Sequence, residues 1–153
     1  VLFRSDRAST TEFEAARQAL LTNSGDVGAW LTFSDALTRE GRTEDAISGL
    51  QVALSAMPND ADLWVGLGQA MMMHAGGMVT PAARLAFDNA SKLAPENPAP
   101  RYFLGLAWLQ AGDAKAALRE WQTLRDSSPP DAPWLPDLDA RIKAVTAMIA
   151  AGG

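Results

Sequence analysis

The sequence predicts an all-α solenoid, a protein built from pairs of helices stacked side by side. The stretch from Trp64 to Met71 places large apolar residues at i, i+3 and i+7, on one face of a helix. Gly68 within it leaves room for a second helix to approach closely. A similar pattern returns before and after this stretch, at intervals of about 34 residues. Such a period is typical of solenoids, in which each pair buries its apolar face only against its neighbours.

The order of large and small residues resembles the signature of the tetratricopeptide repeat (TPR). Trp64, Leu67 and Gly68 are followed by Ala83, Phe87, Ala90 and Pro95 in the expected order. Pro95 ends the second helix of the pair because it has no N–H to donate. We therefore expect a right-handed TPR α-solenoid of three repeats plus flanking helices, with about eight helices in total.

Residues 10–151 are expected to form a single TPR domain. A first helix is predicted from Thr10 to Asn23, and the later elements are three repeats at about 27–60, 61–97 and 98–131 and a C-terminal capping helix at about 136–150. The second repeat is longer than the others. Gly76-Gly77 breaks its first helix and Thr80-Pro81 suits the start of the next, so the extra residues are expected to form a loop.

Residues 1–9 are expected to be disordered or artefactual. Val1 to Ser5 resemble the translation of a common sequencing adapter. We infer from this that the chain is a fragment whose native N-terminus is missing.

Composition narrows the possible functions. The 153 residues are 48% hydrophobic and 20% charged, which is typical of a soluble globular domain. A net charge of -5 argues against nucleic acid as the main partner, because phosphate binding needs a basic surface. The chain has no cysteine, which excludes disulfides and thiol chemistry. No apolar run reaches the roughly 18 residues of a membrane span, so this segment is expected to make no direct membrane contact.

No motif points to an enzyme. The sequence has no G-x-S-x-G, no glycine-rich phosphate loop and no paired histidines. Its one histidine, His74, follows three methionines, and a Met/His cluster could bind Cu(I) or haem. Met71 is, however, a core position of the repeat and His74 begins a loop. We therefore expect no metal and no cofactor.

Four of the five tryptophans, at 30, 64, 108 and 121, fall at signature positions of the repeats and are predicted to be core residues. Trp134 lies between two prolines outside that pattern. We expect Trp134 to staple the last helix to the third repeat.

The TPR resemblance also implies a binding surface. The first helices of successive repeats line a concave groove, and the family pattern assigns fixed repeat positions to it. Here the predicted peptide-binding groove comprises Leu31, Asp35, Thr38, Arg39, Val65, Gln69, Met72, Met73, Tyr102, Leu106, Leu109 and Gln110. It is largely apolar, and methionine adapts to partners of different shape. Such a strip suits an amphipathic helix. It lacks the Lys and Asn with which carboxylate-clamp TPRs hold acidic tails.

Three stretches resemble a narrower family. They are Gly76 to Ala83, Arg101 to Ala107 with Gln110 to Asp113, and Pro130 to Trp134. Together they resemble the C-terminal TPR domain of the CcmI/CycH family of c-type cytochrome biogenesis proteins, over roughly Gly25 to Ile149. The G-G-M-V-T-P loop and the D-A-P-W segment are its specific parts.

The resemblance implies a chaperone-like domain without catalysis of its own. It would lie in the bacterial periplasm, attached to the inner membrane through a missing N-terminal segment. It would hold the C-terminal helix of apocytochrome c and present that chain to the haem-attachment machinery. The charge of -5 would speed encounter with a basic apocytochrome. The alternative is a generic TPR adaptor or scaffold in a bacterial envelope assembly complex, because fold alone does not fix function.

Overall fold

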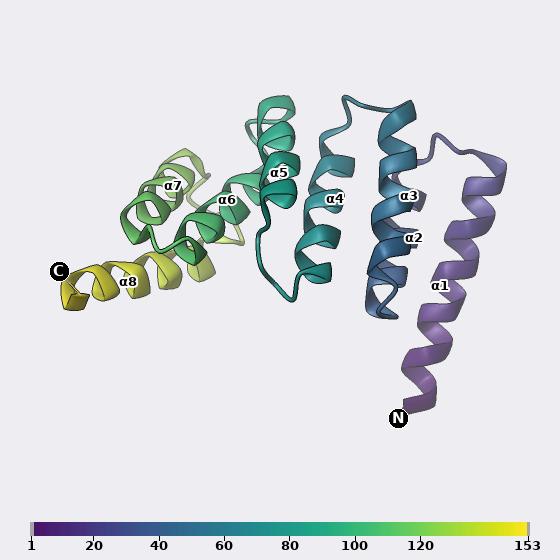
Figure 1. Ribbon diagram of the computed structural model, residues 1–153, viewed down its shortest axis with the longest axis horizontal. Helices are drawn as coiled ribbons and strands as arrows, with labels where there is room; N and C mark the ends of the chain where they lie inside the picture. Colours follow the sequence, from purple (N-terminus) through teal and green to yellow (C-terminus); the bar gives the residue numbers. More distant parts are fainter. Residues whose placement is uncertain (1, 153) are drawn as a thin grey trace.

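The computed structural model describes residues 2–152, with side chains described from Thr11 onward. The secondary structure of this range is helical, and the chain order is α1 (Leu2–Thr22), α2 (Val27–Arg39), α3 (Thr43–Ala56), α4 (Ala61–His74), α5 (Pro81–Leu93), α6 (Pro98–Gln110), α7 (Ala114–Ser127) and α8 (Leu135–Gly152). Helices α1 to α5 stand side by side, and α6, α7 and α8 lie inclined to them at the other end (Figure 1). The prediction of an all-α solenoid of helix pairs is confirmed.

Helix α1 begins earlier than expected. The predicted start at Thr10 is wrong, because the helix runs from Leu2. The backbone of residues 2–9, expected to be disordered or artefactual, is thus helical, and no glycine or proline in that segment interrupts it. The origin of Val1 to Ser5 stays a prediction. Further along α1, the Phe13 ring stacks on Phe33 of α2 with centroids 4.8 Å apart, which fixes α1 to the first repeat.

Side-chain caps define where the repeat helices start. The carboxylates of Asp26, Asp60 and Asp113 each accept a hydrogen bond from the backbone N–H three residues on, at 2.9–3.0 Å. Thr80 does the same for the N–H of Ala83 at 3.2 Å, and Pro81 follows it as the first residue of α5. These caps satisfy N–H groups that have no partner within the helix. The predicted start of α5 after the loop is confirmed.

Small residues set the spacing within each pair. A Cβ built on Gly68 would lie 2.6 Å from the Phe87 ring, and one on Gly105 would lie 2.2 Å from Nε1 of Trp121. Both distances are far inside van der Waals contact. Phe87 and Trp121 therefore occupy the space that a side chain at these glycines would need. Ser34, at the equivalent position of the first repeat, is also buried.

The tryptophans differ in their burial. Trp121 is fully buried, and its indole N–H donates to the Tyr102 carbonyl at 3.0 Å. Trp30 and Trp64 are half-buried and pack against the core formed by α2, α3 and α4. Each donates its indole N–H to a carbonyl six residues earlier, at 2.8 Å, which ties the preceding turn to the helix.

The predictions for the two remaining tryptophans, Trp108 and Trp134, have different outcomes. The prediction of a core residue is wrong for Trp108, which is half-buried under the Arg84 guanidinium, 4.1 Å from the ring centroid. Arg84 replaces the apolar neighbour that a core position would need. The stapling role predicted for Trp134 is confirmed: its N–H donates to the Ser128 hydroxyl at 2.9 Å, and its ring packs on the cluster of Trp121, Leu124, Leu138 and Val145.

Candidate functional site

Helices α2 and α4 form the sides of a groove of about 560 Å³. We name it the first compartment. Most of the residues predicted for the binding groove line it. Its lining includes Leu31, Asp35, Thr38, Arg39, Asp62, Val65, Gly66, Gln69, Met72 and Met73. The structure thus brings the predicted residues of the first two repeats together on one face.

The floor of the first compartment is continuous because Gly66 of α4 has no side chain. A Cβ built on Gly66 would lie 2.8 Å from Cδ2 of Leu31, so the bare backbone of α4 lets α2 pack directly against it. Leu31 and Val65 then form an apolar floor, and Met72 and the more exposed Met73 extend it towards the ends of the helices.

The rim of the first compartment is acidic. Arg39 forms ion pairs with Glu12 at 3.0 Å and with Asp35 at 3.1 Å. The hydrogen bond to Glu12 and the charge of Asp35 raise the pKa of the Arg39 guanidinium above its ordinary value. Asp62 adds a further carboxylate to the lining. Carboxylates therefore outnumber the one guanidinium, and the compartment favours a positively charged partner.

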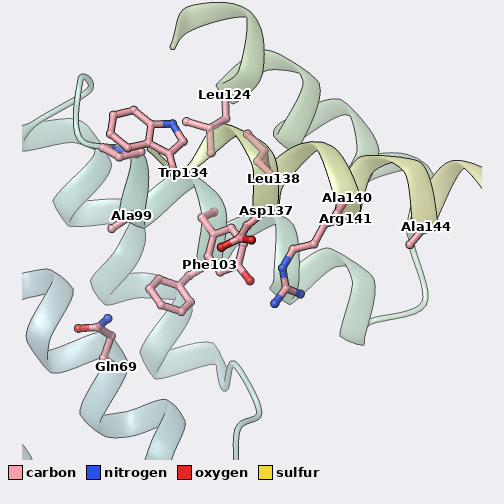
Figure 2. A pocket seen from close by; sticks show the side chains of 12 residues that line it. Gln69, Ala99, Phe103, Leu124, Trp134, Asp137, Leu138, Ala140, Arg141 and Ala144 are labelled. Carbon is pink, nitrogen blue, oxygen red and sulfur yellow. The ribbon is translucent and has the colours of Figure 1, made fainter. Parts of the chain in front are cut away.

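A second hollow of about 800 Å³ lies on the other side of α4, and we name it the second compartment. It is bounded by α4, α6, α7 and α8. Its lining comprises Gln69, Pro98, Ala99, Tyr102, Phe103, Leu124, Trp134, Asp137, Leu138, Ala140, Arg141 and Ala144. Figure 2 shows the Phe103 ring at its centre, Gln69 on one side, and Asp137 and Arg141 of α8 on the other. Gln69 lines both compartments.

The second compartment exists because the third repeat departs from the pattern of the second. Phe103 stands in α6 where Gly66 stands in α4, five residues after the first residue of the helix. Its ring stacks on Phe87 of α5, with centroids 4.7 Å apart and planes 14° from parallel. A phenylalanine there prevents α6 from packing along α4 as α4 packs along α2. The space between the second and third repeats is left open.

Tyr102, one of the residues predicted for the groove, lines this second compartment and not the first. Its ring stacks on Trp121 at 5.9 Å between centroids, and the Arg141 guanidinium lies 5.2 Å from its centroid. The tyrosine is therefore held on one side by the core and carries a cation on the other.

The structure does not bring Leu106 and Leu109 to an open groove. Both pack against the cluster of Trp121, Leu124, Leu138 and Val145. Helix α8 supplies Leu138 and Val145 to that cluster, and α7 supplies Trp121 and Leu124.

Gln110 lines neither compartment, because its side chain is hydrogen-bonded to the loop between α4 and α5. Its side-chain carbonyl accepts from the Val79 N–H at 2.8 Å, and its amide nitrogen donates to the Gly77 carbonyl at 3.0 Å. Gly76 and Gly77 adopt positive φ angles of 66° and 94°, which glycine favours. Gln110 thus fastens the loop between α4 and α5 to the third repeat, and we remove it from the candidate binding residues.

The Met/His segment is divided between core and surface. Met71 packs into the core, whereas His74 is exposed and its Nδ1 lies 2.8 Å from the Thr43 hydroxyl. Across the part of the chain that the structure describes, no group of three or more His, Cys, Asp or Glu side chains is gathered as a metal site. In the same part of the chain, no helix is both long and apolar enough to cross a membrane.

Sequence reasoning missed the contribution of α8 and of Phe103. Asp137 and Arg141 come from the capping helix, which carries no repeat signature. Phe103 carried a signal, because it replaces the glycine found at the same position of the second repeat. Asp62, which lines the first compartment, was also absent from the predicted groove residues, although it is the second residue of its repeat.

Solved structures of similar shape define the class of protein. Similarity is found to a thermophilic TPR protein from Thermus thermophilus (TM-score 0.73, 22% identity, 88% of this chain and 71% of that one). The translocator chaperone SycD of Yersinia enterocolitica matches with TM-score 0.71 and 14% identity, over 86% of this chain and 92% of that one. MamA matches with TM-score 0.66 and 18% identity over 97% and 93%. The chain is a TPR α-solenoid.

Comparison with known protein sequences identifies relatives of the chain within the class of TPR proteins. No protein-family model matches the chain. The cytochrome c-type biogenesis protein CycH of Bradyrhizobium diazoefficiens is 34% identical over 119 residues, 78% of this chain and 32% of that protein. CycH of Rhizobium meliloti is 31% identical over 138 residues, 90% of this chain and 36% of that protein. The chain is thus a TPR-repeat relative of the CycH proteins, and it spans about a third of their length.

Proposed function

We propose that this chain is a non-catalytic, peptide-binding TPR domain that holds the C-terminal helix of an apocytochrome c for haem attachment during c-type cytochrome maturation. The relationship to CycH supports the setting in cytochrome c biogenesis. The parent protein would present the helix to the haem-attachment machinery, from the periplasmic side of the inner membrane to which it is anchored.

One observation carries the proposal: the concave face of the first two repeats is an apolar groove with an acidic rim. Leu31, Val65, Met72 and Met73 offer apolar contacts, and Asp35 and Asp62 lie beside them. An amphipathic helix with basic flanks matches both features, its apolar face against the floor and its cations against the carboxylates. This role requires no catalytic group, because holding an unfolded chain is an equilibrium binding event.

The affinity should be moderate. A peptide that is unfolded in solution loses conformational freedom when it becomes helical, and this offsets part of the gain from burying its apolar face. We expect dissociation constants of roughly micromolar size, equivalent to about -8 kcal/mol.

The test is a calorimetric titration of the domain with a synthetic peptide that spans the C-terminal helix of an apocytochrome c from the same organism. The control is a scrambled peptide of the same composition, which keeps charge and hydropathy but loses the amphipathic pattern. Binding of the native peptide with at least tenfold preference supports the proposal. Equal binding of both peptides contradicts it and leaves a TPR adaptor with a different partner.

A further inference from the structure

We propose that the two compartments bind the partner helix preferentially in one direction. Its N-terminal, basic half lies in the first compartment, and its final turn, which ends in a free carboxylate, lies in the second. This inference rests on the proposed function, because it takes an amphipathic C-terminal helix as the occupant. It adds the orientation of the bound helix, and it assigns Arg141 as the group that recognises the C-terminal carboxylate of the partner.

The two compartments can accommodate one continuous helix. They lie on opposite sides of α4, and the exposed Gln69 side chain borders both. A helix that crosses Gln69 would place apolar side chains on Leu31 and Val65 at one end. At its other end it would place them against Phe103 and Trp134.

The cations of the groove are not equivalent. Arg39 in the first compartment is already paired with two carboxylates, Glu12 and Asp35. Arg141 in the second compartment forms no ion pair within the described residues, and its guanidinium lies over the Tyr102 ring. Asp137 lines the same compartment, so that compartment is neutral as a whole. Arg141 is thus the groove cation that has no carboxylate partner.

This asymmetry matches the polarity of a helix. The N-terminal end of a helix carries a partial positive charge and the C-terminal end a partial negative charge. Asp62 and the excess of carboxylates around Arg39 favour the positive end, and Arg141 favours the negative end and the terminal carboxylate. Each exposed interaction of this kind changes an affinity by about two- to fivefold. The two ends together therefore favour one direction over its reverse.

Orientation is tested by disulfide trapping. The chain has no cysteine, so Thr38→Cys in the first compartment and Ala144→Cys in the second each introduce a unique thiol. Two versions of the apocytochrome peptide carry a single cysteine, one at the N-terminus and one at the C-terminus. We expect the N-terminal version to be trapped faster at residue 38 and the C-terminal version faster at residue 144. The opposite pairing, or equal rates for both versions, overturns the orientation.

The role of Arg141 is tested with peptides that end in a carboxylate or an amide. Arg141→Gln should weaken binding of the carboxylate peptide by about fivefold and leave the amidated peptide less affected. Lys143→Gln is the matched control, because it removes the same charge from the same helix at a residue that lines neither compartment. Equal loss with both peptides, or none with either, overturns the assignment.

These outcomes are separable from failure of the proposed function. If the unsubstituted domain does not prefer the native peptide over its scrambled form, the occupant is wrong. If it does prefer the native peptide and the trapping pairs are reversed, only the direction is wrong.

Discussion

At the scale of single residues, glycine controls how closely the helices of a pair approach. Gly105 faces the fully buried Trp121, and a Cβ there would lie 2.2 Å from Nε1 and 2.5 Å from Cδ1 of that ring. Gly49 in α3 is different, because the nearest atom to its Cβ position is Cζ3 of Trp30 at 3.6 Å, an ordinary contact. The same substitution should therefore have opposite effects at these two positions.

We predict that Gly105→Ala lowers the free energy of unfolding by about 1–3 kcal/mol, because Trp121 must move within a packed core. Gly49→Ala should raise it by about 0.5–1 kcal/mol, because alanine restricts the unfolded chain and fits the helix. Urea denaturation of both variants measures the difference. Stabilisation by Gly105→Ala would contradict the packing described for the third repeat.

Gln110 provides a second prediction at this scale. Gln110→Ala removes both hydrogen bonds to the loop between α4 and α5 and leaves the Val79 N–H without its side-chain partner. We expect a loss of about 1–2 kcal/mol and faster hydrogen exchange at Val79. Gln122→Ala, an exposed glutamine on α7, is the control and should change stability by less than about 0.5 kcal/mol. Unchanged exchange at Val79 would show that the loop does not depend on Gln110.

The repeat pattern predicted single residues well where neighbours close in sequence decide their environment. Gly68 lies against Phe87 of the same repeat, as its place in the motif requires. The pattern failed where a distant element decides. Leu109 occupies a groove position of the third repeat, but it packs against a cluster to which α8 contributes, and Trp108 lies under Arg84 of the preceding repeat. The repeat motif does not specify α8 or Arg84 as a neighbour of these residues.

At the scale of elements, α8 closes the stack. Its residues Leu138 and Val145 are buried against Trp121 and Leu124, and Arg125 of α7 pairs with Asp139 of α8. A terminal helix of this kind protects the apolar edge of the last repeat. It also forms one wall of the second compartment, so it contributes to both stability and binding.

We predict that Leu138→Ala lowers the free energy of unfolding by about 2–5 kcal/mol, as truncation of a buried leucine does. Met148→Ala on the same helix is the control. Met148 is 53% exposed, so its truncation should cost less than about 0.5 kcal/mol. Thermal or urea unfolding compares the two. A loss at Leu138 no larger than at Met148 would mean that α8 does not pack as described.

Element boundaries were predictable where caps and breakers mark them, because these are local signals, whereas the start of α1 has no such mark and was placed wrongly. Thr80 and Pro81 predict the start of α5, and in the structure the helix begins at Pro81 with Thr80 as its N-cap. The relative placement of elements was less predictable. Phe103 opens the second compartment through its contact with Phe87, and that consequence depends on which helices face each other.

At the scale of the whole molecule, the curvature of the stack gathers residues of different repeats on one face. The first compartment combines side chains from α2 and α4, and the second adds α6, α7 and α8. The sequence could predict the first, because both helices follow the repeat pattern. It could not predict the second, which depends on a replaced glycine and on a capping helix without a signature.

The measurement that tests the central claim most directly compares two charge substitutions at methionines of equal exposure. Met73, which lines the first compartment, and Met148, which lines neither, are each 53% exposed. Both variants should fold, because neither side chain is buried. Calorimetric titration with the apocytochrome peptide should show at least about tenfold weaker binding for Met73→Glu, because the bound helix would bury an unpaired charge. Met148→Glu should bind as the unsubstituted domain does. Equal affinities for the two variants would contradict the assignment of the concave groove as the binding site.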